Sequence, residues 1–315
     1  MRCQVLQRHP TFPQAQQEVS EMSSSGPPQA AKAPVGGSDP HAVGKCGGRI
    51  HWPAEAIWEA VSPLLPHFTI EVLPEIDSTN TELMRRARAG QIDPVLLVAE
   101  RQTAGRGRLG RQWFSGEAEA VGARFSSSPL PSLMFSLGLP MAPQDWSGLS
   151  LAVGLSIVES LHPELQLKWP NDVWWQSRKL AGILIETASV GNVRFAVVGV
   201  GINIEPRDSS GLSTPPASLS ELLPGVDAPA TLARVVEPLV LAMQRFEEQG
   251  FAALRTAFHG RDLLCGHTVQ CSDGLTGVAR GVDASGALLV HTENGLKKIT
   301  SAEVSVRPAS SANPI

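Results

Sequence analysis

Short apolar runs and longer stretches with helical spacing follow one another along most of the chain. Runs rich in Val, Leu and Ile, or with period-two alternation, predict strands at 69–73, 94–99, 133–139 and 194–204. Apolar residues three to four positions apart predict helices over 53–65, 78–90, 146–161, 232–246 and 251–258. The middle of the chain is therefore expected to combine strands and helices around a buried core.

A β-hairpin is predicted between residues 165 and 186. A strand from 165 enters a turn at 170–172, and a second strand follows at 178–186. Lys168 and Lys179 are then expected on adjacent strands near the turn. A lysine on an edge strand is usually exposed to solvent, where its charge prevents edge-to-edge pairing with another sheet. Lys179, however, begins an otherwise apolar run, which favours an ammonium aimed at an anion.

The two ends of the chain differ from its middle. Residues 1–49 are rich in Gln, Ser, Pro, Gly and Ala without apolar periodicity, which predicts a disordered extension or a start site set too far upstream. From 263 to 315, short strands separated by Asp-Gly, Ser-Gly and Asn-Gly turns predict a small antiparallel barrel. We therefore expect a main domain at 50–262 and a smaller one at 263–315.

Composition narrows the class of protein. The 315 residues are 42% hydrophobic and 18% charged, as in soluble globular proteins, and the net charge of −4 argues against nucleic-acid binding over the whole surface. Cys3, Cys46, Cys265 and Cys271 lack the spacing of a zinc site and are expected to be free thiols. No apolar run reaches the ~20 residues of a membrane helix or resembles a signal peptide. The expected location is the cytoplasm.

A loop rich in glycine and arginine follows the strand predicted at 94–99. Within 102–113, three glycines alternate with Arg106, Arg108 and Arg111. Glycine lets the backbone approach a ligand, and arginine offers a planar fork of donors for phosphate or carboxylate. Such a string could also be a disordered nucleic-acid-binding tract, but its place between a strand and further apolar sequence favours an anion-binding loop. No Gly-Lys-Ser/Thr follows it, so it is not a Walker loop.

Polar residues stand out at two other places. The run from Asp77 to Asn80 precedes the helix that ends at Gly90, and these residue types commonly cap helices. The same hydroxyl and amide groups could also bind a small polar ligand. Asn203 lies inside a strand predicted to be buried, where its amide needs partners from the protein or from a ligand.

Five motifs in this order make the chain resemble the bacterial biotin protein ligases over roughly residues 55–310. They are Asp-Ser-Thr-Asn at 77–80, the loop at 102–113, Lys-Trp-Pro-Asn-Asp at 168–172, Lys-Leu-Ala-Gly-Ile-Leu-Ile-Glu at 179–186 and Gly-Val-Gly-Ile-Asn at 199–203. The resemblance implies an α+β fold: a catalytic domain like that of class II aminoacyl-tRNA synthetases, with a mixed sheet, and a C-terminal SH3-like β-barrel. It also implies two reactions, the activation of biotin by ATP to biotinyl-5′-AMP and transfer of biotin to one lysine of a carrier protein.

The resemblance also implies roles for individual residues. Lys179, Arg106 and Asp172 would be catalytic, with Lys179 between the biotin carboxylate and the phosphate and Asp172 orienting or deprotonating the acceptor lysine. Biotin would be bound by Ser78, Thr79, Asn80, Gln102, Arg106, Gly107, Arg108 and Lys179, with Gly105 in the same loop. The nucleotide would be bound by Arg111, Trp113, Asn171 and Asn203. Mg²⁺ would bridge the phosphates, and no residue is assigned as a metal ligand.

Some expectations depend on where the chain departs from the family. The repressor branch has an N-terminal winged helix-turn-helix, and residues 1–49 lack a helical pattern, so DNA binding is not expected. The stretch at 116–131 is longer than the usual turn, and a lid is one reading of it. The expected partner is the carrier subunit of acetyl-CoA carboxylase, with no membrane and a possible homodimer. The alternatives are a lipoate or octanoate ligase of the same superfamily and a non-catalytic biotin-sensing regulator.

Overall fold

The computed structural model describes residues 50–113, 130–207, 216–272, 274–300 and 307–308. The predictions for the extension at 1–49 and for the loop at 116–131 fall wholly or almost wholly outside these ranges. Residues Cys46–Ile315 form one compact unit, so the boundary expected at 262 stays a prediction. No helix in the described ranges is both long and apolar enough to cross a membrane.

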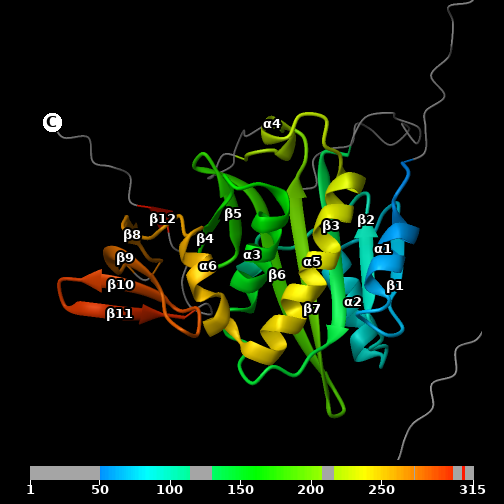
Figure 1. Cartoon of the computed structure of the whole chain (residues 1–315), viewed down its shortest axis with the longest axis horizontal. Helices are drawn as coiled ribbons and strands as arrows, with labels where there is room; N and C mark the ends of the chain where they lie inside the picture. The colour runs from blue at the N-terminus through cyan, green and yellow to red at the C-terminus, as the bar shows by residue number, and fades with distance from the viewer. Residues whose placement is uncertain (1–49, 114–129, 208–215, 273, 301–306, 309–315) are drawn as a thin grey trace, which may run out of the picture. The chain divides into compact units, whose positions relative to one another are not determined.

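The larger part of the chain combines strands and helices, as Figure 1 shows: they alternate up to α3, after which four strands and then four helices follow. The strands of this part are β1 (Thr69–Leu73), β2 (Val95–Ala99), β3 (Ser132–Pro140), β4 (Gln166–Lys168), β5 (Asp172–Trp175), β6 (Arg178–Val190) and β7 (Val193–Asn203). The helices are α1 (Ala54–Val61), α2 (Thr79–Arg88), η1 (Arg108–Gly110), α3 (Leu149–Leu161), α4 (Leu219–Leu222), α5 (Ala228–Gln249), η2 (Phe251–Leu254) and α6 (Arg255–His259).

The seven strands form one mixed sheet in the order β1-β2-β3-β7-β6-β5-β4. β1 and β2 are parallel, and the other neighbours are antiparallel. This confirms the expected mixed sheet of an α+β fold. β6 and β7 are the long central hairpin, with their turn at Gly191, whose φ of 58° suits glycine.

The two faces of this sheet carry different helices. Leu96 and Val98 of β2 belong to the large core with α1, α3 and α5, whereas Val95 and Leu97 join a smaller core with α2. This division follows from the period of two along a strand. In Figure 1, α5 runs across the face of β7 and β3. The face toward α2 is less filled with apolar side chains, which leaves room for polar groups.

The predicted hairpin at 165–186 is wrong in one respect. Residues 165–175 are two strands, because the turn at 170–172 reverses the chain and makes β5 a separate strand between β4 and β6. Lys168 on β4 and Lys179 on β6 are therefore not on adjacent strands. The β5–β6 turn is at Gln176 and Ser177, both with positive φ.

A smaller antiparallel sheet follows in the C-terminal part. Its strands are β8 (Thr268–Gln270), β9 (Thr276–Val282), β10 (Leu288–Thr292), β11 (Gly295–Ile299) and β12 (Arg307–Pro308), in the order β11-β10-β9-β8-β12. This confirms a small C-terminal β domain. The indole Nε1 of Trp169 donates to Gly286 O at 3.0 Å, so a buried hydrogen bond joins the β4–β5 turn to the β9–β10 turn.

Candidate functional site

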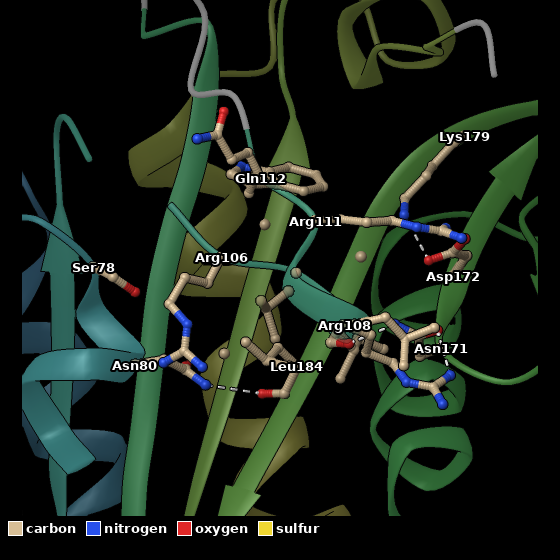
Figure 2. Close-up of a pocket in the computed structure, with 18 of the residues that line it drawn as sticks. Ser78, Asn80, Arg106, Arg108, Arg111, Gln112, Asn171, Asp172, Lys179 and Leu184 are labelled. Carbon is tan, nitrogen blue, oxygen red and sulfur yellow. Dashed lines mark hydrogen bonds and ion pairs between the residues drawn. The ribbon is translucent and has the colours of Figure 1, made fainter. Parts of the chain in front are cut away.

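A cavity of about 180 Å³ lies where α2, the loop at 102–113, the β4–β5 turn and strands β6 and β7 meet. Figure 2 shows side chains from these elements converging on it. The predicted site residues that line it are Ser78, Thr79, Asn80, Gln102, Arg106, Gly107, Arg108, Arg111, Trp113, Asn171, Asp172 and Lys179. Segments more than 100 residues apart in the sequence are thus brought to one place.

The N-terminus of α2 forms one wall of the cavity. Ser78 is the extended N-cap residue, and its hydroxyl accepts from the Thr81 amide. Thr79 N donates to Gln102 Oε1 at 2.8 Å, and Thr79 Oγ1 lies 3.3 Å from the same oxygen. The predicted capping role and the predicted polar wall are therefore parts of one structure.

Asn80 is held in a row of residues that crosses three strands. Ser136, Gly199 and Leu184 are consecutive cross-strand partners on β3, β7 and β6. The Ser136 hydroxyl donates to Asn80 Oδ1 at 2.7 Å, and Asn80 Nδ2 donates to Leu184 O at 3.2 Å and to Glu186 Oε2 at 3.0 Å. A Cβ at Gly199 would lie 2.1 Å from Asn80 Oδ1, so only glycine allows this approach. The Asn80 amide is thereby fixed by the protein itself.

The glycine-rich loop is folded back on itself as a narrow hairpin. Trp113 N donates to Gly105 O at 2.9 Å, and Gly107 N donates to Arg111 O at 2.7 Å. A Cβ at Gly105 would lie 2.5 Å from Trp113 O, which explains glycine at this position. Leu109 has a φ of 56° at the tip. A defined hairpin beside a cavity contradicts the alternative of a disordered tract.

Two arginines of the loop are anchored to different elements. Arg106 Nη2 lies 3.1 Å from Glu186 Oε1, and its Nη1 donates to Thr81 Oγ1 at 3.2 Å. Arg108 Nη1 donates to Asn171 Oδ1 at 3.2 Å. Burial lowers the pKa of Arg108, which the carboxylate of Asp172 opposes. A guanidinium stays charged in proteins, so a partly desolvated cation borders the cavity.

Lys179 and Asp172 form an ion pair at the cavity wall. Lys179 Nζ lies 2.7 Å from Asp172 Oδ1, with side-chain exposures of 31% and 22%. The pair links β6 to the first residue of β5. In Figure 2 the Arg111 side chain extends toward this pair. The sequence-predicted catalytic cation and carboxylate are therefore in direct contact.

The Trp113 indole lies on a floor of two glycines. Gly182 and Gly201 face each other on β6 and β7, and Cβ atoms there would lie 3.2 and 2.4 Å from indole carbons. Lys179 Nζ and Arg207 Cζ lie 5.9 and 5.7 Å from ring centroids of this indole. Its Nε1 is buried, with no hydrogen-bond partner in the described part of the chain. This nitrogen is a donor that a ligand acceptor in the cavity could engage.

Asn203 is placed differently from the other predicted residues. It is fully buried and is not among the residues that line the cavity. Its Nδ2 donates to Lys179 O at 3.2 Å and to Ala217 O at 3.0 Å. In this structure its amide supports the start of β6, and its contact with the nucleotide stays a prediction. Gly105 also lies outside the lining.

Several residues of the site had not been predicted. The alternating glycines Gly199 and Gly201 in a buried strand were a signal, since glycine on one face of a strand marks the close approach of another group. Glu186 and Ser136 gave no such signal, because their contacts with Arg106 and Asn80 exist only in the folded chain. Lys168 lines the cavity, with its Nζ 4.1 Å from the centroid of the Trp174 ring.

The cavity has few ligands for a metal ion. Within the described ranges, Asp172 is the only carboxylate among its lining residues, and the Asn171 amide supplies a further oxygen. Mg²⁺ bound with a nucleotide uses one or two carboxylates together with phosphates and water. The residues therefore fit an ion that arrives with the phosphates rather than a site that the protein builds alone.

Comparisons with known proteins all indicate the same family. Residues 72–203 match the Biotin/lipoate A/B protein ligase family, and residues 272–307 match the Biotin protein ligase C terminal domain. The biotin--[acetyl-CoA-carboxylase] ligase of Mycobacterium tuberculosis is 35% identical over 242 residues, which cover 70% of this chain and 82% of that protein.

A solved structure and a second relative agree. The biotin protein ligase from Aquifex aeolicus in complex with biotin and ATP superimposes with a TM-score of 0.62 at 30% identity, covering 76% of this chain and 99% of that one. The bifunctional ligase/repressor BirA of Escherichia coli is 33% identical over 254 residues, covering 76% of this chain and 75% of that protein. On this similarity, the chain belongs to the biotin protein ligase family.

Proposed function

We propose that the chain is an ATP-dependent biotin–[acetyl-CoA-carboxylase] ligase that attaches biotin to one lysine of a biotin carboxyl carrier protein. The observation that carries the proposal is the cavity itself. It has a polar wall at the N-terminus of α2 and cationic side chains of Arg106, Arg108, Arg111 and Lys179 around a further part of its lining. Biotin has a neutral ureido head group and a carboxylate tail, which match these two kinds of wall.

The first reaction joins two anions. A carboxylate oxygen of biotin attacks the α-phosphorus of ATP, the new bond forms biotinyl-5′-AMP, and pyrophosphate leaves. Two like charges 4 Å apart repel by about 4 kcal/mol at an effective dielectric constant of 20. Arg106, Arg108 and Lys179 offset this repulsion and stabilise the charge that develops on the phosphate. When bound, Mg²⁺ would add positive charge at the phosphates, with Asp172 and Asn171 as its oxygen ligands from this chain.

Adenine is proposed to bind near Trp113. The indole offers a flat apolar surface and a buried N–H. Gly182 and Gly201 have no side chain, which lets the indole lie directly against the backbone of β6 and β7. Arg111 would contact the nucleotide from the loop. Asn203, at the end of β7, would contact it after its side-chain amide turns toward the cavity.

The second reaction transfers the biotinyl group. The ε-amine of the carrier lysine attacks the acyl carbon, an N–C bond forms, and AMP leaves. The attacking ammonium must first lose a proton, and the Asp172 carboxylate is the acceptor at the cavity wall. Lys179 would hold the phosphate of the departing AMP.

The test is acid-stable incorporation of labelled biotin into a purified carrier domain in the presence of MgATP. A carrier variant with its acceptor lysine changed to arginine is the control. Lipoate and octanoate are tested in parallel, since a site built to hydrogen-bond a ureido group rejects acids that lack it. The expected result is transfer of biotin alone. Transfer of lipoate instead, or tight binding of biotin without transfer, would overturn the proposal in favour of a lipoate ligase or a regulator.

Two further points belong to this proposal. The expectation of reduced cysteines, together with ATP as substrate, favours the cytoplasm. Self-association as a homodimer stays a prediction, which sedimentation velocity would check with and without biotin and ATP.

A further inference from the structure

Three side chains with metal-binding atoms meet away from the cavity, where α6 ends and the chain turns toward β8. They are His259, Asp262 and Cys265, which we call the 259–265 cluster. Each offers one ligand atom, and these atoms all lie within 4.8 Å of one another. The cysteine pattern did not indicate this site, because only one of its ligands is a cysteine.

The spacing between the sulfur and the imidazole nitrogen agrees with one shared tetrahedral ion. Cys265 Sγ lies 3.7 Å from His259 Nε2. For Zn–S of about 2.3 Å and Zn–N of about 2.05 Å at a tetrahedral angle, the two ligand atoms are about 3.6 Å apart. A thiolate, an imidazole and a carboxylate are also all common zinc ligands.

Asp262 supplies a second, independent observation. Its Oδ1 accepts from Leu264 N at 2.9 Å. Its Oδ2 is buried and has no hydrogen-bond partner within the described ranges. A buried carboxylate oxygen without a partner is costly, and burial accordingly raises the pKa of this carboxyl. A cation beside Oδ2 would satisfy it.

The backbone that carries the cluster is fixed on two sides. Leu167 N of β4 donates to Arg261 O at 2.7 Å, and Leu263 N donates to Leu167 O at 2.9 Å. On the other side, Gly281 of β9 has a φ of 80°, and a Cβ there would lie 2.6 Å from His259 Cε1. The imidazole therefore packs directly on the β9 backbone, and its approach depends on glycine.

We propose that His259, Asp262 and Cys265 bind one Zn²⁺ ion, with water as the fourth ligand. On coordination the Cys265 thiol loses its proton to solvent, and the sulfur binds as thiolate. Arg280, whose charge acts on Cys265, is a neighbouring cation, and the His267 side chain lies close enough to act electrostatically on Asp262. The ion would join the end of α6 to the segment that enters β8, beside β4.

The test uses Co²⁺ as a spectroscopic probe and Zn²⁺ as its competitor, with the full chain, reduced and without a histidine tag. Wild type is expected to bind one equivalent of Co²⁺ with a sulfur-to-cobalt charge-transfer band that Zn²⁺ removes. Cys265→Ser should abolish the band. His259→Ala and Asp262→Asn should weaken Zn²⁺ binding at least tenfold. His267→Ala is the matched control, because its ring lies outside the set of close ligand atoms, and it should bind like wild type.

Clear results would overturn the proposal. One is the absence of stoichiometric binding to wild type. Another is a band retained in Cys265→Ser, which would assign the sulfur to another cysteine. The third is unchanged zinc affinity in His259→Ala, a variant expected to fold because His259 is exposed. Biotin transfer by the same preparations separates this result from the proposed function, since the cluster lies outside the cavity lining.

Discussion

Replacing Lys179 by alanine removes the cation that is paired with Asp172, the carboxylate found among the described residues of the cavity lining. The Lys179 side chain is 31% exposed and its ammonium is 2.7 Å from Asp172. A partly exposed ion pair contributes about 0–1 kcal/mol to folding, so the variant should remain folded. An electrostatic donor aimed at a developing charge is worth about 100–1000-fold in kcat, or about 3–4 kcal/mol. We therefore expect Lys179→Ala to lose activity by this factor with little loss of stability.

The assay should separate the two reactions. Biotin-dependent exchange of pyrophosphate with ATP reports activation, and transfer from preformed biotinyl-5′-AMP reports acylation. The neighbouring Arg178→Ala is a matched control: Arg178 Nη1 lies 2.9 Å from Glu221 Oε1, with exposures of 30% and 31%, and the residue does not line the cavity. It should lose similar stability and keep exchange activity. Equal loss of exchange in both variants, or a change of less than threefold in Lys179→Ala, would refute the reasoning.

Three further predictions follow from individual contacts. Asp172→Asn keeps an oxygen beside the Lys179 ammonium but cannot take a proton. Transfer from biotinyl-5′-AMP should therefore fall about 100-fold or more, while pyrophosphate exchange falls less. Equal losses in the two assays would argue against Asp172 as a proton acceptor. Gly199→Ala places a Cβ against Asn80 and should raise the Kd for biotin about 10–100-fold in calorimetry, with the ATP Kd unchanged. Burial would raise the pKa of Asp283, but hydrogen bonds, that of Lys298 first, lower it to about 2. Because this is below the unfolded value, the contribution is present above about pH 4 and lost as pH falls toward 2. Asp283→Asn should therefore cost roughly 1–2 kcal/mol in urea unfolding at about pH 7, after allowance for solvent screening, and much less at about pH 2. A pH-independent difference would contradict this.

Patterns of residue type predicted most of the fold. The strand at 69–73 and the buried runs that became β2, β3 and β7 were evident from apolar periodicity. The turn at 170–172 was predicted, but residues 172–175 were not recognised as a strand of their own, because residue types on both sides of the turn are typical of one strand. Antiparallel pairing with β4 on one side and with β6 on the other defines β5.

Motifs predicted the cations and the polar wall but not what holds them. Arg106 and Lys179 were evident as residue types, whereas their partners Glu186 and Asp172 depend on strand pairing. Asn203 shows the opposite case. A buried amide in a strand suggested a ligand contact, yet backbone carbonyls of residues 179 and 217 satisfy its donor group. A sequence cannot distinguish these two uses of an amide, because both need the same side chain.

The two cation–carboxylate pairs have a common consequence for the order of events. Arg106 is 49% exposed beside Glu186, and Lys179 is 31% exposed beside Asp172, so each pair stabilises the protein weakly. An entering carboxylate or phosphate can therefore replace the internal carboxylate at low cost, while the cations are already positioned, which reduces the entropy lost on binding. In the proposed mechanism, Lys179 would turn to the phosphate and leave Asp172 without its ammonium partner at the cavity wall. We therefore predict that the carboxylate accepts the proton of the incoming lysine only after the adenylate has formed.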